Sequence, residues 1–84
     1  MKHRLETLIR SILAENGIDK SFTFTDRLAE IGLTSMDMVS LMLGIEGEFE
    51  VVFPEAEITP ENFNSAATIE SAVRRLLQVD HAHG

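Results

Sequence analysis

The apolar residues in the first fifth of the chain recur at the spacing of an α-helix, and this periodicity restricts the fold more than any other feature. They follow the i, i+3, i+4, i+7, i+8 pattern: Leu5, Leu8, Ile9, Ile12 and Leu13. Asn16-Gly17 then supplies residues that tolerate the backbone conformation of a helix end. The segment is therefore predicted to be an amphipathic helix with one face on a core.

Three more helices are predicted downstream. Thr34 to Asp37 has the spacing of a capping box, so a second helix is expected from Thr34 or Ser35 to about Phe49. Thr59-Pro60-Glu61 has the order of a short helix start. Ser65 is the expected cap of a last helix that turns apolar residues inward: Ala66, Ile69, Ala72, Val73, Leu76 and Leu77. The predicted fold is all-α, a small four-helix bundle of three main helices and one short helix.

Length and composition indicate one folded domain. With 84 residues, 44% of them hydrophobic, we expect a single domain over residues 1–79 and a flexible tail over 80–84. No apolar run reaches the roughly 18 residues of a membrane span, and the first residues lack the apolar stretch of a signal peptide, so we expect a cytoplasmic protein. The chain has no cysteine, and His81 and His83 have no further ligands nearby. We therefore expect no metal site and no thiol chemistry from the chain's own residues.

The charge is unevenly distributed. The net charge is −7, and no Lys or Arg occurs from Leu28 through Val73. Such a stretch disfavours nucleic-acid binding, which needs clustered bases, and attracts basic partners. A solvated face that keeps a small protein soluble would have the same composition.

The predicted second helix has two apolar faces. At about 100° per residue, one arc carries the side chains needed for a core: Met38, Leu41, Met42, Ile45 and Phe49. A different arc carries Met36, Val39 and Leu43, with Glu46 on one side and Asp37 and Glu48 on the other. This second arc is predicted to be an exposed partner-binding surface. Periodicity equally allows the bundle to wrap round and bury Val39 or Leu43.

Ser35 lies at the start of this helix, where backbone N–H groups and the helix dipole favour an anion. Most serines at such positions are only caps. Here Thr34 is the better cap, which leaves the Ser35 hydroxyl at the first helical position, pointing outward and unused. Ser35 is therefore a candidate for modification.

The stretch Gly-Leu-Thr-Ser-Met-Asp-Met-Val-Ser-Leu, from Gly32 to Leu41, resembles the modification motif of acyl and peptidyl carrier proteins, usually Gly-x-Asp-Ser-Leu. The resemblance continues through Leu43 to Phe49, Phe53-Pro54 and Thr68-Ile69, and covers nearly the whole chain in order. It implies a four-helix bundle in which Ser35 carries a 4′-phosphopantetheine arm, transferred from coenzyme A by a magnesium-dependent holo-carrier-protein synthase. The arm ends in a thiol that holds an acyl or aminoacyl cargo as a thioester.

The resemblance also implies that partner enzymes recognise the second helix. The matching positions are Met36, Val39 and Leu43 for apolar contact, and Asp37, Glu46 and Glu48 for basic residues of the partner. The implied partners are the holo-synthase, an acyl- or aminoacyl-loading ligase and downstream transferases of a biosynthetic pathway, such as that of fatty acids or lipids. We expect a monomeric, non-catalytic carrier.

Three positions depart from the family pattern. Thr34 replaces the usual aspartate before the serine, Ser40 stands where many fatty-acid carriers have glutamate, and Gly47 interrupts the acidic run. These departures count against recognition by generic fatty-acid enzymes. The long link after the second helix, including residues 62–65, is similar to that of discrete carriers that bear amino acids.

Two further expectations concern cargo and class. A core crowded with five phenylalanines favours a small polar cargo over a long fatty acyl chain, because overpacking is destabilising, although flexible Met38 and Met42 argue the other way. The alternative from a different class is an unmodified acidic helical adaptor, which would bind a basic partner through Met36, Val39 and Leu43.

Overall fold

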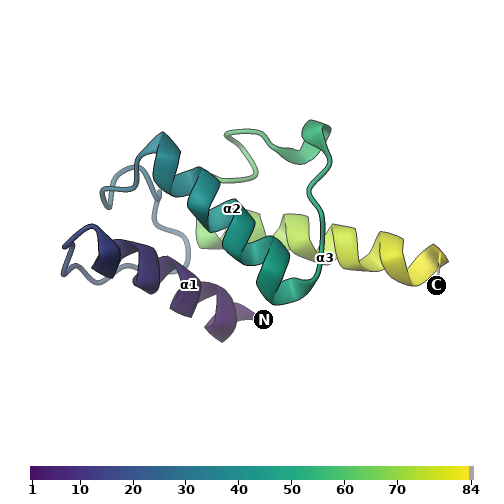
Figure 1. Cartoon of the computed structure of the whole chain (residues 1–84), viewed down its shortest axis with the longest axis horizontal. Coiled ribbons are helices and arrows are strands. Elements are labelled where there is room, and N and C mark those ends of the chain that lie inside the picture. The colour runs from purple at the N-terminus through teal and green to yellow at the C-terminus, as the bar shows by residue number, and fades with distance from the viewer. Residues whose placement is uncertain (84) are drawn as a thin grey trace.

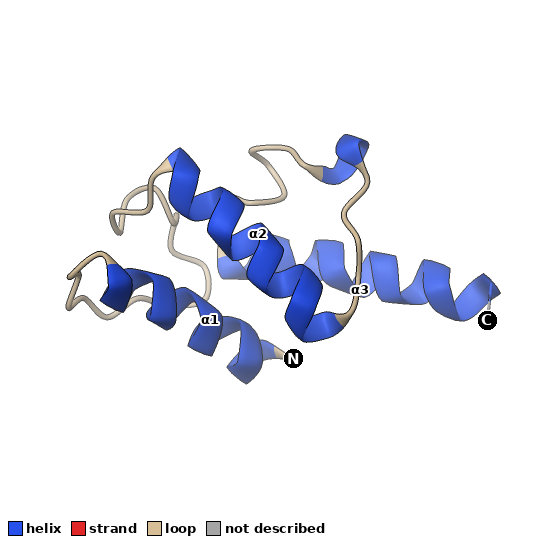
Figure 2. Ribbon diagram, in the orientation of Figure 1, coloured by secondary structure: helices blue, strands red, loops and turns tan. Residues whose placement is uncertain are grey.

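A computed structural model of the chain describes residues 1–83, with side chains as far as Gln78. The elements in order are α1 (Lys2–Glu15), α2 (Ser35–Phe49), the short 3-10 helix η1 (Glu55–Glu57) and α3 (Ala66–His83). α1 packs against both α2 and α3 (Figure 1). Within the described residues there are helices and loops but no strand, so the predicted all-α fold of three main helices and one short helix is confirmed (Figure 2).

α1 supplies one side of the core and ends as its sequence predicts. Leu5 and Ile9 are fully buried on its inner face. After Glu15, Gly17 adopts a left-handed conformation (φ 71°), and the Ile18 N–H donates to the Leu13 carbonyl at 2.8 Å. This is the arrangement of a Schellman motif, and it turns the chain back onto the core.

Residues 18–34 form an irregular connection that is held to the start of α3. The Leu28 N–H donates to the Asn64 carbonyl at 2.9 Å, and the Ala67 N–H donates to the Phe24 carbonyl at 3.0 Å. Gly32 has a φ of 110°, and a Cβ there would lie 2.9 Å from Ile18 Cδ1, so the turn before α2 requires glycine. These contacts hold the connection that leads into α2 against the start of α3.

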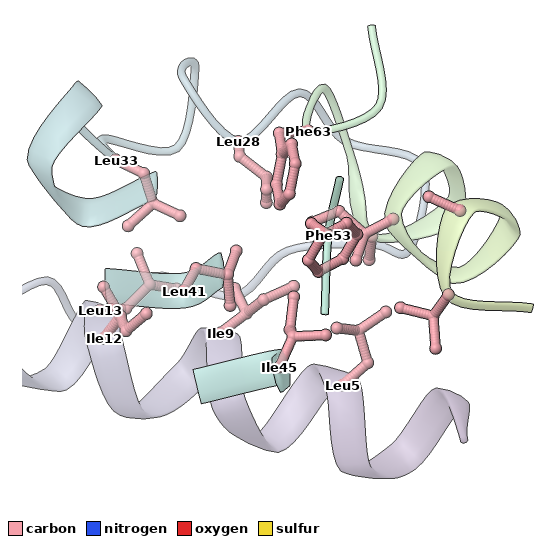
Figure 3. Packing of buried hydrophobic residues seen from close by; sticks show 14 of the residues in the cluster. Leu5, Ile9, Ile12, Leu13, Leu28, Leu33, Leu41, Ile45, Phe53 and Phe63 are labelled. Carbon is pink, nitrogen blue, oxygen red and sulfur yellow. The ribbon is translucent and has the colours of Figure 1, made fainter. Parts of the chain in front are cut away.

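The core lies between α1, α2 and α3. Leu41 and Ile45 of α2 are fully buried beside Ile9 (Figure 3). Farther along the chain, the rings of Phe53 and Phe63 pack together with their centroids 5.2 Å apart. Burying such side chains is the main contribution to stability in a chain without disulfides.

The phenylalanines do not crowd the core as the sequence suggested. Only Phe53 and Phe63 are buried, while the other three pack at the edge of the core. Each edge ring lies beneath a cation: Phe22 under Arg10, Phe24 under Lys2 and Phe49 under Arg4. Aromatic rings at the edge gain this cation–π contact, which a fully buried ring would not make.

The short helix lies earlier in the chain than predicted. The 3-10 helix covers Glu55–Glu57, directly after Pro54, and not residues 59–61. Thr59 nevertheless caps a single turn: its hydroxyl accepts from the Asn62 N–H at 3.2 Å, and the Phe63 N–H donates to its carbonyl at 3.2 Å. The ring of Phe63, at the end of this turn, is buried in the core.

The last helix begins directly after its predicted cap, Ser65. The Ser65 hydroxyl accepts from the Thr68 N–H at 3.3 Å, and the Thr68 hydroxyl accepts from the Ser65 N–H at 3.0 Å. α3 covers Ala66–His83, and the flexible tail expected over residues 80–84 stays a prediction. The stretch contains no proline or glycine, so its backbone has no helix breaker. Gly84 and the side chains of His81 and His83 lie outside the described part of the structure.

The described residues include neither a membrane-spanning helix nor a metal-binding group. None of the helices there is long and apolar enough to cross a membrane. In the same part of the chain, no group of three or more His, Asp or Glu side chains is arranged to hold a metal ion.

Candidate functional site

A reciprocal pair of hydrogen bonds caps the start of α2. The Thr34 hydroxyl oxygen accepts from the Asp37 N–H at 3.2 Å, and the Asp37 carboxylate accepts from the Thr34 N–H at 2.8 Å. The predicted capping box is therefore confirmed. Thr34 thus keeps the capping function at a position where the carrier motif usually has aspartate.

Ser35, the first residue of α2, is exposed next to this capping box. Its hydroxyl makes no hydrogen bond to any residue in the described part of the chain. Because Thr34 and Asp37 already form the capping box, the Ser35 side chain is not needed as a cap. Its oxygen is available for chemistry at a place where the helix N-terminus favours a negative charge.

The hydrogen bonds of the cap hold the pKa of Asp37 below its ordinary value of 3.8. The largest cause is the bond from the Thr34 backbone N–H, and the Asn16 side chain at the end of α1 lowers the pKa further. Each bond stabilises the ionised carboxylate more than the protonated form.

We expect the start of α2 to lose its cap in acid. A carboxylate whose folded pKa is depressed stabilises the fold above its unfolded pKa, and this contribution is lost as the pH falls through 3.8 and then through the folded pKa. NMR titration of the Thr34 amide from about pH 6 to about pH 2 measures the loss directly, since that N–H donates to the carboxylate. Asp37→Asn, which cannot ionise, should lack this titration step. An identical step in that variant would show that another group titrates there.

The second apolar face of α2 is exposed. Met36, Val39 and Leu43 are 75%, 48% and 58% exposed, whereas Leu41 and Ile45 on the opposite face are fully buried. The bundle therefore does not wrap round to bury Val39 or Leu43. That this face binds a partner stays a prediction.

The carboxylates predicted beside this face are held by the chain itself. Besides Asp37 in the cap, the Glu46 carboxylate accepts from the Phe53 N–H at 2.8 Å. The Glu48 carboxylate pairs with Arg4 at 3.1 Å, and Arg4 also donates to the Glu48 carbonyl at 2.7 Å near the end of α2. The contacts of Glu46 and Glu48 were not revealed by periodicity, and the charge of Glu48 is paired with that of Arg4.

A pocket of about 410 Å³ opens beside Ser35. Besides Ser35 it is lined by residues of α2 and of two loops: Ala29, Met38, Val39, Met42, Ile58, Thr59, Pro60, Phe63 and Asn64. The volume is in the lower part of the range of small-molecule sites, and most of the lining is apolar. The loop residues of this pocket were not predicted, and the long link between Phe49 and Ile69 is the sequence signal that pointed to those in residues 58–64.

The loop wall of the pocket is anchored to α3. Arg75 donates to the Glu57 carboxylate at 3.1 Å and to the Asn62 side-chain oxygen at 3.2 Å. The Asn62 side chain also donates to the Glu57 carbonyl at 2.8 Å. These bonds hold residues 57–62 in place opposite α2.

Comparison with known proteins agrees with this geometry. The family model described as phosphopantetheine attachment site matches residues 3–76. Aminoacyl carrier protein 1 of Bradyrhizobium diazoefficiens is 46% identical over 78 residues, which cover 93% of this chain and 87% of the relative. The aminoacyl carrier protein of Agrobacterium fabrum is 36% identical over 78 residues, 87% of this chain and 93% of the relative.

The solved structures include carriers bound to an enzyme. A Bradyrhizobium japonicum glycine:carrier protein ligase, complexed with its cognate carrier protein and an analogue of glycyl adenylate, contains a chain with a TM-score of 0.76 and 46% identity. The match covers 88% of this chain and 96% of that one. In a related complex with glycylated carrier protein, the TM-score is 0.74 at 46% identity, over 84% of this chain and 96% of that one. The chain described here therefore belongs to the phosphopantetheine-binding carrier protein family, in its aminoacyl carrier group.

Proposed function

We propose that this chain carries a small amino acid on a 4′-phosphopantetheine arm attached to Ser35 and presents it to partner enzymes. The observation that carries the proposal is the exposed Ser35 hydroxyl, which is free of hydrogen bonds within the described residues and lies beside a complete capping box. Phosphopantetheine, the prosthetic group of this family, supplies a terminal thiol on which the cargo is held as a thioester.

The residues around Ser35 fit this group. The N-terminus of α2 is the positive end of the helix dipole, which favours the negatively charged phosphodiester of phosphopantetheine. The pocket beside Ser35 offers an apolar lining from Met38, Met42 and Phe63, with the polar residues Thr59 and Asn64 nearby. A chain that only served as an unmodified adaptor would need neither the free hydroxyl nor this pocket.

The proposed partners follow from the site and the relatives. A holo-carrier-protein synthase attaches the arm, and a ligase of the kind seen with the Bradyrhizobium carriers loads the amino acid. The exposed face formed by Met36, Val39 and Leu43 is the proposed contact for these enzymes. The chain itself acts as a non-catalytic monomer.

Glycine is the first cargo to test. Holo-protein incubated with glycine, ATP and the Bradyrhizobium glycine:carrier protein ligase is expected to gain one glycyl group by intact mass, and hydroxylamine should release it because it cleaves thioesters. Apo-protein is the matched control and should gain nothing. Failure of the holo-protein to accept glycine or any other amino acid would contradict an aminoacyl carrier function.

A further inference from the structure

Gly47 is exposed on α2, and no contact or backbone conformation in the described part of the chain requires a glycine there. Its φ is not positive, and apart from its two chain neighbours and the helix's own backbone, no atom would lie within 4 Å of a Cβ at this position. A helix with glycine in its interior is less stable than the same helix with alanine, because glycine loses more backbone freedom on folding. The residue therefore makes the isolated protein less stable without relieving strain or a clash.

Gly47 continues the exposed apolar face. Residues 39, 43 and 47 are spaced by four and so lie on one side of the helix. Val39 and Leu43 are both exposed large apolar side chains, and Gly47 is exposed one turn beyond Leu43. The face defined by Met36, Val39 and Leu43 therefore extends to a stretch of helix that has no side chain.

The side chains on either side of Gly47 in the sequence do not cover it. The Glu46 carboxylate is bonded to the Phe53 N–H at 2.8 Å, and the Glu48 carboxylate is paired with Arg4 at 3.1 Å. Both contacts are to other segments of the chain, and Gly47 itself is exposed. The backbone at Gly47 is thus directly accessible to another molecule.

The other glycine of α2 provides a contrast. Gly44 is half-buried on the side of α1, and a Cβ there would lie 3.5 Å from Leu8 Cδ2, an ordinary van der Waals distance. Alanine therefore fits at both positions, but only the alanine at residue 47 would project from the exposed face.

We propose that Gly47 is a close-approach position for the amino-acid-loading ligase, at which an apolar side chain of the ligase packs against the bare helix backbone and Leu43. This inference rests on the proposed function. Charge complementarity defines the rest of the contact. α2 has no Lys or Arg of its own, and although Glu48 is paired with Arg4, Glu50, three residues beyond Gly47, is exposed and has no ion pair among the described residues. The matching surface of the ligase is therefore an apolar side chain with a Lys or Arg beside it that meets Glu50.

The test compares loading of three holo-variants by the Bradyrhizobium glycine:carrier protein ligase with glycine and ATP. Gly47→Leu is expected to raise the KM for the carrier about 10-fold or more with little change in kcat, because it blocks docking and leaves the arm intact. Gly47→Ala should raise KM less, and Gly44→Ala, the matched control, should leave it unchanged. Thermal unfolding should show both alanine variants at least as stable as the parent chain.

The outcomes separate the inference from the proposed function. A Gly47→Leu carrier that is loaded with the parent KM would overturn the close-approach role while leaving the aminoacyl carrier function in place. Equal increases in KM for Gly44→Ala and Gly47→Ala would also overturn it, because they would indicate a need for helix flexibility. Absence of loading in the parent holo-protein with every amino acid would overturn the proposed function itself.

Discussion

Replacing Ser35 with alanine is expected to abolish attachment of phosphopantetheine and to leave the fold intact. The Ser35 hydroxyl is exposed and makes no hydrogen bond to the described residues, while Thr34 and Asp37 cap the N-terminus of α2. Its removal therefore costs the isolated protein no contact, and the better helix propensity of alanine changes stability by at most about 0.5 kcal/mol. The loss of modification, in contrast, should be complete, because no other atom takes the place of the serine oxygen.

Loss of phosphopantetheine attachment is measured by intact mass, after the protein is incubated with a holo-carrier-protein synthase, magnesium and coenzyme A. Ser40→Ala is the matched control, because Ser40 is an exposed serine of the same helix five residues later. It should be modified like the parent chain, and circular dichroism should show equal helix content in both variants. Modification of Ser35→Ala, or loss of modification in Ser40→Ala, would move the attachment site away from Ser35.

Truncating two leucines that are two residues apart on α2 is expected to have opposite consequences. Leu41 is fully buried, so Leu41→Ala should lower the free energy of unfolding by about 2–5 kcal/mol through lost burial and a cavity. A domain of this length has a total stability of roughly 4–13 kcal/mol, so the loss is a large share of it. Leu43 is 58% exposed, and Leu43→Ala should change the same free energy by no more than about 0.5 kcal/mol.

For binding to a partner, Leu43→Ala should have a larger effect than Leu41→Ala. Leu43→Ala is expected to speed dissociation of the complex with the loading ligase, because an apolar contact of the interface is lost. Urea unfolding measures the change in the free energy of unfolding, and surface plasmon resonance with holo-protein measures the dissociation rate. Equal destabilisation by the two substitutions would mean that Leu43 is buried, and unchanged dissociation by Leu43→Ala would remove this face from the interface.

The acids predicted to meet basic residues of a partner are not the best positions for charge reversal, because they also make contacts within the chain. Charge reversal at Glu46 would also remove the acceptor of the Phe53 N–H, and reversal at Glu48 would place a base beside Arg4. Both changes would disturb the fold as well as any encounter with a basic partner. Glu50 has no ion pair in the described part of the chain, so its reversal is the cleaner probe of electrostatic steering.

The sequence by itself determined the features that depend on neighbours within about one helical turn. The end of α1 at Asn16-Gly17, the capping box of Thr34 and Asp37, and the Ser65 cap of α3 are all formed between residues at most five apart. Such contacts are specified by residue type and spacing alone. For the same reason the sequence identified Ser35 as a free hydroxyl at a helix start.

Tertiary structure alone decided which groups from distant segments meet. Arg4 and Glu48 are 44 residues apart in the chain, and their ion pair exists only because α1 packs against α2. The pocket beside Ser35 combines α2 with residues 58–64, which Arg75 of α3 holds in place through Glu57 and Asn62. The exposure of Val39 and Leu43 likewise depends on how far the other helices reach around α2, because periodicity describes a helix face but not what covers it.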